Sequence, residues 1–257
     1  MHETFLTTRG VATLDAAAAP GYWSQMVSGT DPIFAGEAIT CVRGARLVFH
    51  GLDFMLWGGD ALVLVGPNGS GKSSLLRLMA GLSTPANGQL RWNDAQIVED
   101  RQAHGARIHY VGHATGTKPA LTTSEDLAFW SAFKLQNNPT AQRDALAHFG
   151  LSARANFPVR FLSSGQKRRL ALARLIAAPA PLWLLDEPTV GLDTNGQAAL
   201  ETAVARHRAS GGILVVASHT TIALGETEIT LDLSTFSATG GTFLDEDGLG
   251  LGLEMGA

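Results

Sequence analysis

Short apolar runs separated by glycine and asparagine follow one another from residue 39 onward, and this pattern predicts β-strands. We expect strands at residues 39–42, 47–49, 54–56 and 61–65. Two later runs, residues 182–185 and 213–217, are apolar throughout, which is typical of strands buried on both faces of a parallel sheet. A mixed α/β arrangement follows if helices lie between these strands.

Helical segments are predicted by spacing and by end signals. Residues 75–80 form an apolar helical stretch that Gly81 should end, and residues 88–92 and 96–98 suggest a small antiparallel excursion. Between residues 121 and 162 the pattern becomes helical, beginning with a capping box at Thr122 and Glu125. Asn138 and Pro139 break this stretch, and a second amphipathic helix ends at Gly150.

The two ends of the chain differ from the middle. Residues 1–36 are rich in Ala, Gly, Ser and Thr without sustained periodicity, so we predict a disordered N-terminal extension, unless Met26 is the true start. Residues 236–257 end in a glycine-rich acidic stretch and are predicted to be a C-terminal hairpin or tail. The working domain is therefore expected over residues 37–235, with a helical subdomain at about 114–165.

Composition excludes several classes of protein. Of 257 residues 45% are hydrophobic, so a substantial core is expected, and the net charge of −4 argues against a nucleic-acid partner. The apolar runs are far shorter than a spanning helix requires, and the N-terminus carries no secretory h-region. The lone Cys41 excludes an intrachain disulfide. We expect the chain to work in the cytoplasm.

The strongest chemical signal is a complete G-x-x-x-x-G-K-[ST] motif between the strand at 61–65 and a helix. Glycines let the backbone wrap closely around a phosphate, and the helix start favours an anion. Lys72 is placed for the β- and γ-phosphates, and the Ser73 hydroxyl for Mg²⁺. The predicted ATP-binding residues are Gly66, Pro67, Asn68, Gly69, Ser70, Gly71, Lys72, Ser73 and Ser74.

A second signal is the pair of carboxylates that ends the apolar run at residues 182–185. Parallel-sheet sites lie at strand ends, and this pattern is that of a Walker B element. Asp186 is predicted to hold Mg²⁺, directly or through water. Glu187 is predicted to be the general base that orients the attacking water.

The stretch from Leu162 to Arg174, beginning Leu-Ser-Ser-Gly-Gln, resembles the signature motif of ABC ATPases. In that family the motif opens a helix whose N-terminus meets the γ-phosphate held by the opposite subunit, so the resemblance implies a homodimer formed through ATP. It assigns the nucleotide of the opposite subunit to Ser163, Ser164, Gly165 and Gln166. Ser164 stands where a glycine is usual.

The resemblance also implies the fold and the remaining motifs. The expected fold is α/β: a P-loop NTPase ABC-type nucleotide-binding domain with a RecA-like parallel-sheet core, a small antiparallel β subdomain and a helical subdomain. Asp193 ends a stretch similar to the D-loop, and His219 stands where the switch histidine lies, so Glu187, His219 and Lys72 are the predicted catalytic set.

Two positions depart from the family pattern. His113 stands where the Q-loop glutamine is usual, which makes it a candidate nucleotide contact and Mg²⁺ ligand. Arg43 stands where an aromatic side chain usually stacks on adenine, and its guanidinium plane could stack instead. His109 and His113 also have the spacing of a helical metal pair, although their segment is predicted to be a strand.

Within the family, the sequence is similar to the cytochrome c maturation branch, the haem exporter ATP-binding subunits, at residues 41–49, 112–122 and 181–188. This implies a CcmB-like integral permease as partner, haem only through partners, and a peripheral position on the cytoplasmic face of the bacterial inner membrane. Residues 113–135, with Lys118, Leu121, Phe129 and Trp130, are the predicted docking segment, unless the two aromatics only fill the core of the subdomain.

Three alternatives remain open. The chain could energise another exporter, for a lipid or a drug. It could be a soluble ABC ATPase of DNA repair or translation, although these carry two cassettes or a long coiled coil, and heptads are absent here. A nucleotide kinase would share only the P-loop.

Overall fold

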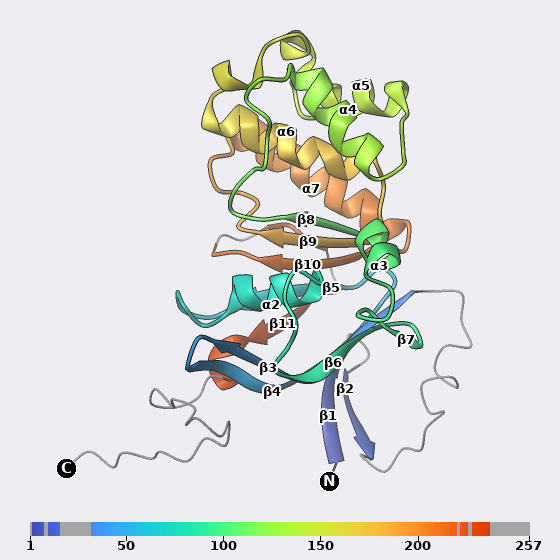
Figure 1. The fold of residues 1–257 in the computed structure, drawn as a ribbon, viewed down its shortest axis with the longest axis vertical. Coiled ribbons are helices and arrows are strands. Elements are labelled where there is room, and N and C mark those ends of the chain that lie inside the picture. The colour runs from blue at the N-terminus through green and yellow to red at the C-terminus, as the bar shows by residue number, and fades with distance from the viewer. Residues whose placement is uncertain (1, 8–9, 16–31, 220–221, 226–227, 237–257) are drawn as a thin grey trace, which may run out of the picture.

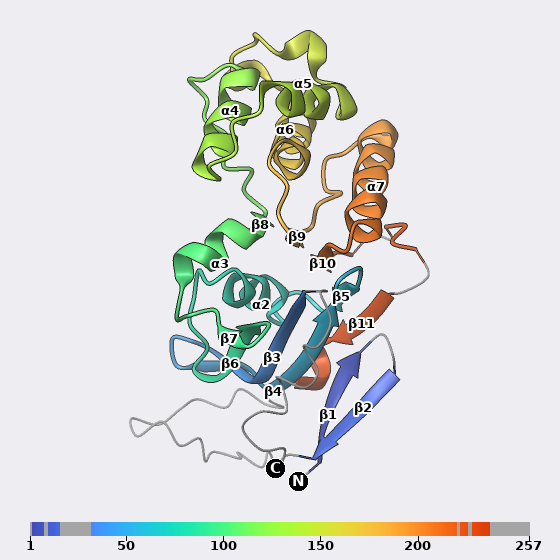
Figure 2. The same cartoon turned by 90° about the vertical axis from the view of Figure 1, so that its right-hand side faces the viewer.

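The computed structural model describes residues 2–7, 10–15, 32–219, 222–225 and 228–236. These residues form two sheets stacked below a group of helices (Figure 1). One sheet is parallel and the other is largely antiparallel, and the helices α4, α5 and α6 gather at the far end of the parallel sheet (Figure 2). This is the predicted α/β architecture with a parallel core, an antiparallel subdomain and a helical subdomain.

The parallel sheet has the strand order β11-β5-β10-β9-β8. Its central strands are β5 (Ala61–Val65), β9 (Leu182–Asp186) and β10 (Ile213–Ala217), and its edges are β8 (Ile108–Val111) and β11 (Glu228–Asp232). Every residue of β9 and β10 is buried, as their uninterrupted apolar sequences predict. In register, Ala217 lies between Leu64 and Asp186, so the three central strands end together.

The second sheet has the order β2-β1-β4-β3-β6-β7. Its long pair, β3 (Ile33–Arg43) and β4 (Arg46–Trp57), is antiparallel and interrupted by bulges, and β6 (Asn87–Trp92) and β7 (Ala95–Gln96) extend it. The hairpin β1 (His2–Thr7) and β2 (Gly10–Asp15) adds to the β4 edge through a single parallel pair.

Helix α2 (Lys72–Met79) lies between the two sheets and joins their cores. Its apolar side chains pack in one cluster with Phe34 and Phe49 of the antiparallel sheet and with alternate residues of β9 and β10. The other residues of those two strands face the helical side, where α6 (Ser164–Ala177) and α7 (Thr194–Ala209) cover them. The period-two alternation thus divides the core into two clusters.

The helical subdomain is built from α4 (Thr123–Phe133), α5 (Pro139–His148), the short 3-10 turns η1 (Ser152–Arg154) and η2 (Val159–Phe161), and the start of α6. The predicted capping box is present: the Thr122 side chain accepts from the Glu125 amide, and Glu125 accepts from that of Thr122. Asn138 caps α5, and Gly150 follows its end at φ 65°.

The structure differs from the sequence-based predictions in two places, and a third prediction lies almost wholly outside the described residues. The predicted disordered extension, residues 1–36, contains β1, β2 and the start of β3, whose Ile33, Phe34 and Ala35 are buried; residues 1, 8–9 and 16–31 lie outside the described part. Helix α3 (Arg101–Arg107) was not predicted. Of the predicted C-terminal hairpin or tail at 236–257, only Phe236 is described, at the end of the turn η3 (Leu233–Phe236). Residues 237–257 lie outside the described part.

Within the described residues, no helix combines the length and the apolar character that crossing a membrane requires.

Candidate nucleotide site

The predicted motifs meet at the carboxyl end of the parallel sheet. The glycine-rich loop follows β5, the Asp186–Glu187 pair ends β9, and His219 follows β10. Together they line a pocket of about 560 Å³. The residues that line it are Arg43, Arg46, Val48, Asn68, Gly69, Gly71, Lys72, Ser73, Ser74, His113, Asp186, Glu187, Val190 and His219.

The loop between β5 and α2 depends on glycine at its last turn. Gly71 has φ 104°, and a Cβ there would lie 2.7 Å from Val48 Cγ1. No side chain caps α2 at Gly71, so the first backbone N–H groups of the helix stay free to meet an anion. The predicted phosphate-binding geometry is therefore available.

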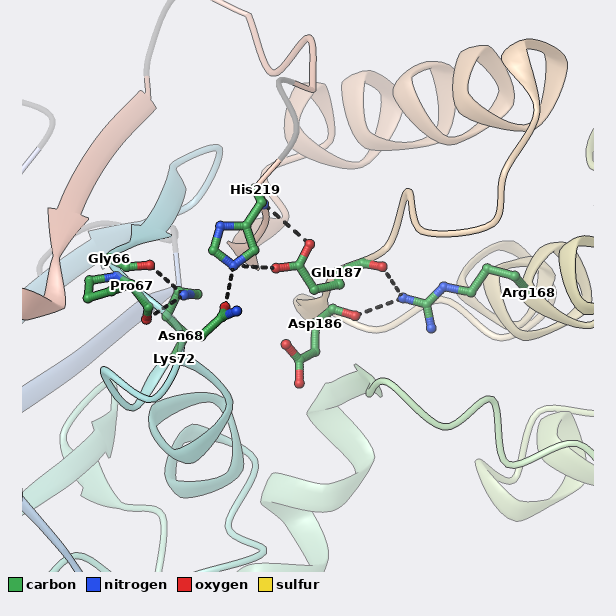
Figure 3. Close-up of polar contacts among 8 residues, drawn as sticks. All are labelled: Gly66, Pro67, Asn68, Lys72, Arg168, Asp186, Glu187 and His219. Atoms are coloured by element: carbon green, nitrogen blue, oxygen red, sulfur yellow. Dashed lines mark hydrogen bonds and ion pairs between the residues drawn. The ribbon is translucent and has the colours of Figure 1, made fainter.

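Lys72 is buried at the centre of this loop. Its ammonium donates to the carbonyl oxygens of Gly66 at 2.6 Å and Pro67 at 3.2 Å (Figure 3). An ammonium has three donors, so one remains for a phosphate oxygen. The two carbonyl bonds hold the charge at the mouth of the loop.

Glu187 has a left-handed backbone conformation, with φ 47°, which is uncommon outside glycine. Its amide donates to the carbonyl of Ala217 at 2.8 Å, which fixes the end of β9 to the end of β10. The carboxylate faces His219, whose backbone amide donates to Oε2 at 3.2 Å (Figure 3). Asp186 and Glu187 thus point to different parts of the pocket, as predicted from their positions in the chain.

The His219 ring joins the Glu187 carboxylate to the glycine-rich loop. Its Nε2 lies 3.5 Å from Glu187 Oε1 and 3.1 Å from Asn68 Oδ1. A single ring nitrogen is thus shared between the carboxylate and the loop (Figure 3).

The predicted Mg²⁺ ligands, Ser73, Asp186 and His113, line the same pocket. A serine hydroxyl and a carboxylate are the hard oxygen donors that Mg²⁺ prefers, and phosphate oxygens and water would complete the shell. Among the described residues no three His, Cys, Asp or Glu side chains cluster as a protein-only metal site. His113 offers nitrogen, so the donor chemistry favours Ser73 and Asp186 over it.

His109 and His113 do not form a metal pair, and His109 lies in a strand, as predicted. His109 is buried in β8 and its Nε2 contacts the Ala178 carbonyl, whereas His113 is exposed beyond the end of the strand.

The signature residues lie outside this pocket. Ser163 caps α6 and forms a capping box with Gln166, and Ser163 and Ser164 are exposed. Gly165 permits close packing, because a Cβ there would lie 2.6 Å from the Gly191 carbonyl oxygen. Asp193 caps α7 and is also absent from the pocket lining. The start of α6, which is predicted to face a phosphate, therefore does not contribute to the pocket of its own chain.

Sequence reasoning missed Arg168, in the second turn of α6. The residue is 4% exposed, and its guanidinium donates to the backbone carbonyls of Asp186, Glu187, Pro188 and Gly112. Burial lowers the pKa of Arg168, while the nearby negative charges of Asp186 and Glu187 raise it. The helical period could have revealed it, because Arg168 shares a face with the buried Leu172 and Leu175.

Comparison with known proteins identifies a family at sequence level. A model described as ABC transporter matches residues 49–190. The cytochrome c biogenesis ATP-binding export protein CcmA of Rhodospirillum rubrum is 52% identical over 219 residues, covering 84% of this chain and 94% of that protein. The protein of the same name from Paramagnetospirillum magneticum is 50% identical, covering 79% of this chain and 95% of its own length.

Solved structures show the same fold. An ATP-binding subunit of an ABC transporter superposes with a TM-score of 0.71 at 22% identity, covering 78% of this chain and 86% of that one. An ATP-binding cassette in a dimeric post-hydrolysis state, bound to ADP and Pi, superposes with a TM-score of 0.68 at 23% identity, covering 78% and 94%.

Proposed function

The chain belongs to the ABC transporter ATP-binding family and, within it, to the CcmA group of cytochrome c biogenesis ATP-binding export proteins, and on that premise we propose that it hydrolyses MgATP to drive a haem-related step of c-type cytochrome assembly. The observation that carries the proposal is that the predicted motifs lie in two separate places on the chain. The P-loop, both carboxylates and His219 share one pocket, while the signature helix begins outside it.

ATP binding uses the P-loop. The free N–H groups at the start of α2 surround the phosphates, and Lys72 offers its remaining proton to the β- and γ-phosphates. Ser73 and Asp186 are the residues that would hold Mg²⁺. The ion, when bound, neutralises charge on the phosphates. Arg43 and Arg46, which also line the pocket, lie beside the loop, and Arg43 is the proposed stacking partner of adenine.

Hydrolysis uses Glu187. Its carboxylate accepts a proton from water as the water oxygen attacks the γ-phosphorus and the bond to the ADP oxygen breaks. His219 holds that carboxylate through its amide and its ring, and the ring also reaches Asn68 of the P-loop. A change at the γ-phosphate therefore reaches both the loop and the base through one imidazole.

Each chain contributes half of two sites. Ser163, Ser164, Gly165 and Gln166 would close the pocket of a second copy, and Asp193 would lie beside them at the same interface. The exposed start of α6 supports this arrangement, because a capped helix N-terminus that faces no ligand in its own chain is available to the γ-phosphate of a partner.

The membrane partner is proposed to dock in a groove of about 740 Å³ between the parallel core and the helical subdomain. Trp130 and Phe133 give it an apolar wall, and Phe133 is 74% exposed. Its basic side chains are Arg77, Arg101, Lys134 and Arg174. Arg77 and Arg101 are exposed there, so a segment that combines an apolar face with acceptor groups fits the groove.

Of the two aromatic side chains predicted for the docking segment, Trp130 lines this groove and Phe129 does not. Phe129 is 44% exposed, which contradicts the alternative that it only fills the core, and the Lys118 ammonium lies 5.3 Å from the centroid of its ring. We take a CcmB-like permease of the inner membrane as the partner, with this chain on its cytoplasmic face and haem handled by partners only. No nucleic acid is involved.

Affinity purification from membranes tests this function. The full-length chain should capture an integral membrane protein, and a strain lacking the chain should regain holo-cytochrome c only when an active copy is supplied. Glu187→Gln is the control that should still capture the membrane protein but fail to restore assembly. Capture of an unrelated exporter, with normal cytochrome c in the deletion strain, would exclude the cytochrome assignment and leave the ATPase assignment intact.

A further inference from the structure

Arg168 binds the backbone of the catalytic segment from behind. Its Nε donates to the Pro188 carbonyl at 3.2 Å, and one terminal nitrogen donates to the carbonyls of Asp186 and Glu187, each at 2.7 Å. Its other terminal nitrogen donates to the Gly112 carbonyl at 2.7 Å. Every nitrogen of the guanidinium is therefore engaged, and all four acceptors are backbone oxygens.

These carbonyls belong to the residues on which the chemistry depends. Asp186, Glu187 and Pro188 are consecutive at the end of β9, and Gly112 precedes His113. Figure 3 shows the guanidinium on one side of this segment, with the Glu187 carboxylate directed to the other side, toward His219. Arg168 thus touches neither the pocket nor a reacting group.

Glu187 needs such support because its backbone is strained. A φ of 47° is unfavourable for a residue with a Cβ and persists only where the surroundings fix it. The Ala217 carbonyl holds its amide, and Arg168 holds its carbonyl together with those on both sides. If these bonds are lost, the peptide can relax and the carboxylate turns away from its place beside His219.

The same arginine ties this segment to the signature helix. Arg168 lies five residues after the capping residue Ser163. Further along α6, Arg174 donates to the Thr115 carbonyl at 2.8 Å, so the two arginines hold the segment around His113 at both ends. A movement of α6 is therefore transmitted to the backbone of Glu187 and to the loop of His113.

We propose that Arg168 is a positioning residue that keeps Glu187 in its catalytic conformation and links that conformation to the position of the signature helix. The inference rests on the proposed function, since it acts through Glu187 as general base. ATP binding does not depend on it, because Lys72 and the P-loop make their contacts without Arg168.

The test is a double-mutant cycle with Arg168→Lys and Glu187→Gln, read by single-turnover hydrolysis and nucleotide affinity. One ammonium cannot reach all four carbonyls, so Arg168→Lys should lower kcat about tenfold or more while the Kd for MgATP changes less than about threefold. In the Glu187→Gln background, Arg168→Lys should lower the rate less than about twofold, because the carboxylate that Arg168 positions is already absent.

Arg208→Gln is the control. Arg208 donates to the Gly59 carbonyl at 2.9 Å, and neither residue lines the pocket. The control variant should lower the melting temperature without changing kcat per folded molecule. Arg168→Gln extends the series if it folds. An equal loss of rate from Arg168→Lys in both backgrounds, or a kcat within twofold of the unaltered chain, overturns the inference. Full activity of Glu187→Gln overturns the catalytic assignment itself.

Discussion

At the scale of single residues, the pocket differs from its family pattern chiefly at His113. The side chain lines the pocket from the loop after β8, and it is exposed. Arg168 and Arg174 hold the carbonyls of Gly112 and Thr115 on either side of it. The position of the backbone is therefore set by α6, and the identity of the side chain is free to vary without moving the loop.

His113→Gln should consequently leave the kcat for ATP hydrolysis within about one order of magnitude. Glutamine has an oxygen acceptor and an amide donor, so it can bind water or phosphate as an imidazole can. Steady-state hydrolysis with saturating MgATP measures the effect, with His113→Ala as the control that removes both functions. A loss in His113→Gln as large as that in His113→Ala would show that the imidazole itself is required.

At the scale of elements, the docking prediction concerns the loop before α4. Lys118 is exposed and lies over the Phe129 and Trp130 rings, at 5.3 and 5.9 Å from their centroids, and Leu121 is partly exposed two residues before α4 begins. Placing a carboxylate at both positions, Lys118→Asp with Leu121→Asp, introduces negative charge beside an apolar surface that should receive acceptor groups.

The double variant should lose co-purification of the membrane protein and cytochrome c assembly, while hydrolysis by the isolated chain stays within about twofold. Arg143→Asp, on the exposed face of α5, is the control for a charge reversal elsewhere on the helical subdomain and should do neither. Normal holo-cytochrome c in cells that carry the double variant would mean that the partner binds elsewhere or that the cytochrome assignment is wrong.

The parallel sheet itself should be sensitive to acid. Burial lowers the pKa of His109 to about 4, and burial likewise lowers that of His207, which stacks on Trp183, to about 4. Lys134, Arg174 and His207 lower the pKa of His109 further, and its contact with the Ala178 carbonyl opposes them.

Both rings are thus neutral in the folded chain and charged in the unfolded chain below about pH 6.5. Stability is full above pH 6.5 and is lost as the pH falls toward 4. For His109 the loss is about 2 kcal/mol at pH 5. Urea unfolding at pH 7.5 and pH 5 should show that His109→Gln loses about this much less between the two values than the unaltered chain. If the free energy of unfolding depended on pH identically in both proteins, the lowered pKa of His109 would be contradicted.

The elements that the sequence predicted well are those whose signal is local. The first four residues of β9 are all apolar, and the P-loop must lie between a strand and a helix. The capping box at Thr122 and the side-chain cap of Asn138 mark helix starts. Helix α3 was missed because its sequence, RQAHGAR, has no apolar period, and its one buried side chain is His104, which contacts the Met79 carbonyl 25 residues away. Tertiary contact, not propensity, holds that helix.

In the candidate site, too, the residues that the sequence predicts are those with a local signal. Lys72, Asp186, Glu187 and His219 were predictable because each follows a strand at a position the motif fixes. The helical period could have shown that Arg168 is buried, but not what it binds, since its acceptors lie between 18 and 56 residues away in the chain. The lining residues Arg46 and Val48 were missed for a similar reason, because only the pairing of β3 with β4 brings their hairpin over the P-loop.

At the scale of the whole molecule, the proposed ATP hydrolysis requires a second copy of the chain. The pocket holds the groups for binding and for water activation, while the residues that should meet the γ-phosphate from the other side begin a helix elsewhere on the chain. A single chain therefore binds ATP in an open site, and closure requires the exposed Ser163 and Ser164 of a partner. We propose that ATP lies between the two copies and that its hydrolysis lets them separate.

The measurement that tests this most directly is the mass of the Glu187→Gln variant in solution, by light scattering after size exclusion, with and without MgATP. Removing the base leaves the P-loop contacts intact, so the variant should be a monomer without nucleotide and a stable dimer with MgATP. Adding Lys72→Ala, or Ser163→Glu at the start of α6, should abolish the dimer. A Glu187→Gln variant that stays monomeric in MgATP, while the unaltered chain hydrolyses ATP at full rate as a monomer, would contradict the account.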